Sequence, residues 1–214
     1  MSHCIKLKTS EDSNIFVWGC LHAFHKQPFV WQKRGYSSFE EHTESLLEKI
    51  NNTCRPNDIL FLLGDGFLNS EPSQVKDYLN KVKCKISYIF GNHESSVKRI
   101  YKEEVFNQFC RTDINVFPLN WNNVTFYGDY LETLIDKKLV VFSHFPLKVW
   151  NNSKFGAYHL HSHNHGGLPS SLPSCKEGYI LDCGVDVFPD GPVPFSKIIE
   201  VMNTKTQVTF DSHH

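Results

Sequence analysis

The sequence predicts an α/β fold in which two packed β-sheets are flanked by helices. In the first half of the chain, apolar runs that suit buried strands alternate with segments of helical spacing. In the second half, short apolar runs are separated by Gly, Pro and Asn turns. Two sheets that pack together with helices outside would bury both kinds of run. The length of 214 residues suits one domain, so residues 1–214 are predicted to form a single domain.

Helices and strands alternate in the first half of the predicted fold. Strands are expected at Asn14–Trp18, Asp58–Leu63 and Lys85–Phe90. One helix begins at Ser38, whose hydroxyl can cap it, and Glu41 three residues later completes a capping box. A second helix has Pro72 in its first turn, where proline is favoured. Residues 95–110 are predicted to form a third helix, because their apolar side chains recur at helical spacing.

The second half is predicted to consist mostly of strands. The expected strands are Ile114–Leu119, Val124–Tyr127, Leu139–Phe142, Ala157–Leu160, Tyr179–Cys183 and Lys197–Met202. The residues between them are rich in turn formers, which is typical of strands joined by short connections.

Composition and charge narrow the classes of partner. Hydrophobic residues make up 40% and aromatic residues 14% of the chain, which excludes a disordered protein. The net charge of -1 gives no support for an extended nucleic-acid track or for an anionic membrane surface. A phosphorylated small molecule or nucleotide remains compatible, because bound metals can supply local positive charge.

Cysteine usage and hydropathy suggest a cellular location. The seven cysteines are an odd number and form no CxxC pair, which favours a reducing compartment over a disulfide framework. The first residues lack the apolar core of a signal peptide, and no apolar run approaches the roughly 20 residues of a membrane span. We therefore expect a soluble, cytoplasmic protein.

Side chains that can bind metals follow five of the predicted strands. These clusters are Gly19-Cys-Leu-His22, Gly64-Asp65, Gly91-Asn-His-Glu94, Ser143-His144 and His161-Ser-His-Asn-His165. Taken singly, Gly64-Asp65 is ordinary turn chemistry, and the last cluster can also be a solvated His-rich loop. Because ligands bind outside the carboxyl ends of strands in open α/β sheets, we expect the clusters to converge. Such a collection of ligands suits a hydrolytic metal centre.

The order of these clusters resembles the calcineurin-like metallophosphoesterase superfamily, whose pattern reads D-x-H, G-D, G-N-H-[DE], H and G-H-x-H. The resemblance runs from Trp18 to about Phe195. Ser143-His-Phe-Pro-Leu147 resembles the family's S-H-[YF]-P stretch. Gly184-Val-Asp-Val187 resembles the strand that follows the last histidine pair in small bacterial and phage members. The resemblance implies a four-layer αββα sandwich of two packed mixed β-sheets with flanking helices. It also implies metal-dependent hydrolysis of a phosphate ester by a water that two metals activate.

The resemblance also implies a role for each site residue. Asp65 would bridge two divalent ions, for which manganese, iron and zinc are candidates. The first ion would be bound by Cys20, His22 and His165, and the second by Asn92, His144 and His163. His93 would be the catalytic residue, protonating the leaving oxygen or contacting the phosphate, and Asn92 would also face the substrate. Asp186 and His161 are candidates to hold the outer ring nitrogens of ligand histidines.

Two positions depart from the family pattern. Cys20 replaces the first Asp, which indicates either a lost ligand or thiolate ligation that favours zinc or iron over magnesium. Ser162 stands where the family usually has Gly, which adopts positive φ more readily, so a small local shift is expected. Of the other polar residues nearby, the basic pair Lys33-Arg34 is predicted to be solvated. Three tryptophans, Trp31, Trp121 and Trp150, are predicted to pack in the core or at its rim.

The resemblance leaves several functions open. Protein Ser/Thr phosphatases share the G-N-H-E string, but their D-R-G is replaced here by Asp65-Gly-Phe-Leu-Asn69. A single domain also lacks the capping domain of the family's DNA nucleases. We therefore favour a phosphodiester of a nucleotide or nucleic-acid end, with a phosphomonoester as the other ester class. The alternatives are a catalytically weakened scaffold or binding protein, suggested by Cys20, and a zinc-binding redox sensor that uses the same cysteine.

Overall fold

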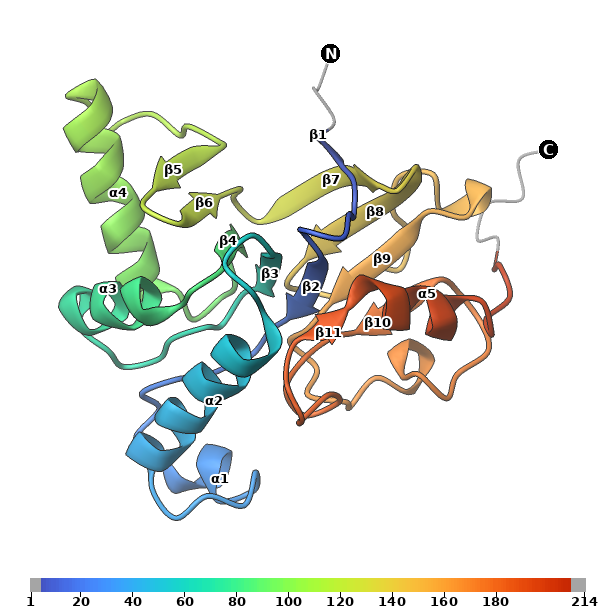
Figure 1. The fold of residues 1–214 in the computed structure, drawn as a ribbon, viewed down its shortest axis with the longest axis horizontal. Coiled ribbons are helices and arrows are strands. Elements are labelled where there is room, and N and C mark those ends of the chain that lie inside the picture. The colour runs from blue at the N-terminus through green and yellow to red at the C-terminus, as the bar shows by residue number, and fades with distance from the viewer. Residues whose placement is uncertain (1–4, 209–214) are drawn as a thin grey trace.

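The computed structural model describes residues 5–208, and two mixed β-sheets form its centre (Figure 1). One sheet has the strand order β11-β2-β3-β4-β6-β5. Its strands are β2 (Ile15–Trp18), β3 (Ile59–Leu63), β4 (Lys85–Ile89), β5 (Leu119–Trp121), β6 (Val124–Phe126) and β11 (Val193–Pro194). The other sheet has the order β1-β7-β8-β9-β10. Its strands are β1 (Ile5–Leu7), β7 (Tyr130–Ile135), β8 (Lys138–Ser143), β9 (Tyr158–His161) and β10 (Ile180–Asp182).

The two sheets pack against each other through an apolar core. Val17 and Phe61 of the first sheet and Phe142 and Leu160 of the second are all buried in it. The rings of Phe61 and Phe142 stack with centroids 4.3 Å apart and planes 8° from parallel. The prediction of an α/β fold with two packed mixed sheets and flanking helices is thereby confirmed.

Helices α2 (Phe39–Thr53), α3 (Pro72–Lys81) and α4 (Ser95–Phe109) pack on the opposite face of the six-stranded sheet. The Ser38 hydroxyl caps α2 as predicted, accepting the Glu41 N–H at 3.1 Å. The Glu41 carboxylate, however, accepts from the N–H of Ser37 rather than from that of Ser38. The predicted position of Pro72 in the first turn of α3 is also confirmed.

Two of the predicted strands are wrong. Lys197–Met202 lies within helix α5 (Phe195–Met202). Its Ile and Val residues favour a strand, but burial of Phe195, Ile198 and Met202 at spacings of three and four fits a helix on the core between the sheets. Of Ile114–Leu119, only Leu119 belongs to a strand. The remaining short helical segments are α1 (Pro28–Trp31), η1 (Ser153–Phe155) and η2 (Pro169–Ser171).

Strand β7 was not predicted, and residues 184–187 are not the strand that the resemblance implies. β7 pairs with β8 through a tight turn in which Asp136 and Lys137 have φ of 48° and 70°. Such turns usually contain Asn-Gly or Asp-Gly, so the sequence carries no clear hairpin signal there. After β10, Gly184 forms an isolated bridge to Gly19 and the chain then turns.

Parallel pairing brings the carboxyl ends of the central strands to one edge. Trp18 pairs with Leu62, and Leu63 pairs with Ile89, so β2, β3 and β4 end side by side. In the other sheet β8 and β9 are also parallel. Within residues 5–208, no helix combines the length and apolar character needed to cross a membrane.

Candidate metal centre

The loops that carry the predicted ligands are tied together by backbone hydrogen bonds. The N–H of Cys20 donates to the carbonyl of Gly64 at 3.0 Å, and that of His22 donates to the carbonyl of Asp65 at 2.9 Å. Five predicted ligands have positive φ values near 50–60°, namely Cys20, His22, Asp65, His163 and His165. This conformation costs L-residues free energy, on the order of 1–3 kcal/mol each, and such residues cluster at functional sites.

One group of ligand atoms converges on Nε2 of His144. Asn92 Oδ1 lies 2.9 Å away, His163 Nδ1 3.1 Å and Asp65 Oδ2 3.3 Å. The other ring nitrogen of His144 is 2.9 Å from the carbonyl of Leu63, which orients the imidazole so that Nε2 faces the cluster. Burial acts to lower the pKa of His144, but the hydrogen bond and charge of Asp65 outweigh it and raise that pKa.

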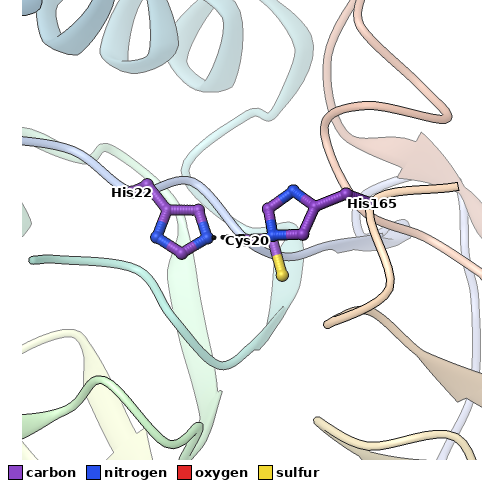
Figure 2. A group of neighbouring side chains, drawn as sticks. All are labelled: Cys20, His22 and His165. Carbon is purple, nitrogen blue, oxygen red and sulfur yellow. Dashed lines mark hydrogen bonds between the residues drawn. The ribbon is translucent and has the colours of Figure 1, made fainter. Parts of the chain in front are cut away.

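A second group consists of Cys20, His22 and His165, whose ligand atoms all lie within 4.8 Å of one another. Figure 2 shows the two imidazoles with one nitrogen of each turned toward the other. Their Nε2 atoms are 3.3 Å apart. Two nitrogens bound tetrahedrally to one zinc, at about 2.0–2.1 Å, would be about 3.3 Å apart, so this spacing fits a shared cation. Burial and the neighbouring His165 lower the pKa of His22 to about 3, so His22 is neutral, as a ligand must be.

Cys20 belongs to the second group and also lies close to the group around His144. Its sulfur is within 4.8 Å of the ligand atoms of His22 and His165, and also of those of Asp65 and His144. The thiol is fully buried and accepts the N–H of His163 at 3.0 Å. Burial raises the pKa of the Cys20 thiol to about 12, so in the absence of a cation the sulfur is protonated at neutral pH.

The Asp65 side chain contacts the backbone of His93 and not its imidazole. Oδ1 of Asp65 accepts the His93 N–H at 2.8 Å, which leaves the His93 side chain free of the ligand groups and exposed. A Cβ at position 91 would collide with Oδ1 of Asp65, so only Gly91 allows this close approach. The His93 ring centroid lies 6.4 Å from that of His22, beside the second group.

The arrangement agrees with comparisons to known proteins. The matching family description is calcineurin-like phosphoesterase, over residues 13–188. The chain belongs to the calcineurin-like phosphoesterase family. Membership supports a metal-dependent phosphoesterase in general, and members of the family typically bind divalent metals.

Two individual proteins resemble this calcineurin-like phosphoesterase. An uncharacterized protein of Methanocaldococcus jannaschii is 28% identical over 81 residues, which cover 37% of this chain and 46% of that relative. The crystal structure of a protein of unknown function from Aquifex aeolicus superposes with a TM-score of 0.57 at 16% identity. That superposition covers 88% of this chain and 99% of the other, and it shows a likeness of fold.

Arg34 was predicted to be solvated, and this prediction is wrong. Its side chain is only 6% exposed and pairs with Asp186 through two hydrogen bonds, of 3.2 and 2.7 Å. The guanidinium also donates to the carbonyls of Cys20 and Leu21. Asp186 in turn accepts from Nδ1 of His165 at 2.6 Å, as the sequence suggested. Arg34 of this calcineurin-like phosphoesterase therefore supports two candidate ligands at once.

The structure also accommodates the Ser162 departure locally, and it tests the role suggested for His161. Ser162 is buried without a positive φ, and its hydroxyl donates to the Leu63 carbonyl beside His144. The Ser162 side chain fits because the facing residue, Gly19, has no side chain. A Cβ at position 19 would lie only 2.8 Å from the Ser162 side chain. His161 does not hold a ligand histidine: its Nδ1 bonds the Ser162 carbonyl, and its buried Nε2 has no partner among residues 5–208.

Proposed function

We propose that this calcineurin-like phosphoesterase hydrolyses a phosphodiester of a nucleotide or of a nucleic-acid end. The observation that carries the proposal is the convergence of Asn92, His163 and Asp65 on one nitrogen of His144. Next to it, the close pair of imidazoles from His22 and His165 offers a second position for a cation. Two bound divalent ions would neutralise phosphate oxygens and lower the pKa of a water molecule.

The proposal assigns a separate role to each group of site residues. Cys20, His22 and His165 would hold one cation, of manganese, iron or zinc, and Asn92, His144 and His163 would hold the other. Asp65 would bridge the two cations, and its Oδ1, which accepts the His93 N–H, keeps His93 at the edge of the site. Because the His93 imidazole is exposed and is not among the converging ligands, it is available to donate a proton to the leaving oxygen.

Separate substitutions test these roles. Asp65→Ala should remove both metal and activity, because a ligand shared by the two groups is lost. His93→Ala should keep the metal content but lower kcat by about 10²-fold or more, as expected for a general acid. The measurements are metal analysis of protein purified without chelator and turnover of bis(p-nitrophenyl) phosphate and p-nitrophenyl phosphate. Loss of metal in His93→Ala would show that the assigned role is wrong.

Cys20 favours one alternative, a scaffold of the same fold with weakened catalysis. In that case the group formed by Cys20, His22 and His165 would bind metal weakly, since the protonated thiol is a poor ligand. Purified protein that holds at most one cation and turns over neither ester would support the scaffold. Faster turnover of the diester than of the monoester would instead support the proposed substrate class.

A further inference from the structure

A pocket of about 470 Å³ opens beside the candidate metal ligands. Its walls include His22, His93 and His165 on the side of the metal centre. They also include three residues with no role in the proposed metal centre, His25, Phe29 and Lys33. A group attached to a phosphate at the metal centre would therefore have a space of its own to enter.

A continuous line of rings leads from the metal centre to the surface through this pocket. Ring centroids are 6.4 Å apart between His93 and His22, 6.1 Å between His22 and His25, and 5.2 Å between His25 and Phe29. Phe29, in the short α1 segment, is 69% exposed. A single exposed phenylalanine is ordinary, but one that ends such a line and borders a pocket offers a flat apolar face to a ligand.

His25 adds a hydrogen-bond donor to the same pocket. Its Nδ1 accepts the backbone N–H of Gln27 at 3.1 Å, so the neutral imidazole carries its proton on Nε2. The ring is fixed further because the backbone N–H of His25 donates to the carbonyl of His22. An oriented N–H donor next to a candidate metal ligand suits an oxygen of a phosphate or a sugar.

The charges that remain available in the pocket favour an anionic ligand. The one carboxylate among its walls, Asp186, is already bound by Arg34 and His165. The ammonium of the exposed Lys33 therefore has no competing carboxylate within the pocket. An aromatic face, an N–H donor and a cation together match a base, a sugar and a phosphate.

We propose that this pocket binds the nucleoside part of the substrate, with its base stacked on Phe29. His25 and Lys33 then contact oxygens of the sugar or of the phosphate. The inference rests on the proposed phosphodiesterase activity. It identifies one of the two alcohols esterified in the diester as a nucleoside. It places recognition of the substrate in the segment that follows β2, outside the metal ligands.

The sharpest test compares a diester that carries a base with one that lacks it. The two diesters are the methyl esters of thymidine 5′-phosphate and of abasic deoxyribose 5′-phosphate, followed by ³¹P NMR. The wild type should have the higher kcat/KM for the thymidine ester. Phe29→Ala should reduce this preference by about fivefold or more, and Phe29→Tyr should keep it, because stacking needs a ring rather than a particular residue. Phe155→Ala, at a phenylalanine that is 74% exposed on η1, is the matched control and should leave the preference as in the wild type.

A binding measurement distinguishes failure of this inference from failure of the proposed function. Calorimetric titration with thymidine 5′-monophosphate should show tighter binding to the wild type than to Phe29→Ala, whereas inorganic phosphate should bind both proteins alike. If neither ester is hydrolysed, the proposed function fails, and the thymidine monophosphate titration still decides whether the pocket binds a nucleoside. Equal ester preference and equal nucleotide affinity in wild type and Phe29→Ala would overturn the inference.

Discussion

Arg34 and Asp186 form a buried ion pair that joins loops 152 residues apart in the sequence. The pair has two hydrogen bonds, and its side chains are 6% and 10% exposed. Burial acts to raise the pKa of Asp186, but the bonds from His165 and Arg34 outweigh it and hold that pKa well below its ordinary value. Asp186 is therefore a carboxylate that can fix the ring of His165 with Nε2 toward His22.

Arg34→Ala should weaken metal binding without removing any ligand. Loss of a residue that orients a ligand typically lowers metal affinity by about 10- to 100-fold. Arg34→Lys should also weaken binding, because an ammonium cannot form the two-point pair. Calorimetric titration of metal-free protein measures the effect. Arg99→Ala, which removes the exposed partner of Glu71, is the control. A wild-type metal affinity in folded Arg34→Ala would contradict the positioning role.

Cys20 should make metal binding depend on pH. Because burial raises the thiol pKa to about 12, a cation that binds the sulfur must displace its proton at neutral pH. The metal affinity of the group formed by Cys20, His22 and His165 should therefore rise with pH, by up to about tenfold per pH unit for one released proton. Cys20→Asp should lose this contribution and shift preference toward manganese. Cys20→Ala should bind metal more weakly beside His22 and His165 and leave the group around His144 occupied. Titrations at pH 6 and pH 8 check this, and the same affinity and pH slope in Cys20→Ala would rule out thiolate ligation.

Phe142→Ala should destabilise the contact between the sheets. The Phe142 ring is fully buried and stacks on Phe61 of the other sheet. Its loss should lower the free energy of unfolding by about 3–5 kcal/mol, as large-to-small core substitutions do. Urea denaturation measures the change, and Phe106→Ala, at a residue 53% exposed on α4, should cost far less. Equal losses in the two variants would contradict the packing described.

His159 should make the protein less stable in acid. Burial lowers the pKa of His159 to about 4, and its Nε2 accepts the Leu147 N–H, a bond that protonation would break. The unfolded chain takes up this proton near pH 6.5, so the stabilisation is complete above pH 6.5 and is lost as the pH falls toward 4. It amounts to about 3 kcal/mol at about 1.4 kcal/mol per pKa unit. Urea denaturation at pH 7 and pH 4.5 should show a smaller loss of the free energy of unfolding in His159→Gln than in the wild type. Equal losses in the two proteins would contradict this role of His159.

Much of the fold followed from local signals in the sequence. The helix cap at Ser38 and the proline in the first turn of α3 depend only on neighbouring residues, and both are confirmed. The order of the ligand clusters also predicted which side chains would come together, because parallel strands end at one edge. The failures lie where a local preference was overruled, as in α5, where packing on the core between the sheets outweighed the strand preference of Ile and Val.

The sequence by itself determined which residues stand at the strand ends, since each cluster directly follows an apolar run. Only the tertiary structure decided how those residues are held. Arg34 looks like one of two adjacent surface cations in the sequence, yet it is buried because Asp186 reaches it from a distant loop. A buried charge is tolerated only when it is paired and hydrogen-bonded, and its partner here lies 152 residues away, beyond the range of any local pattern.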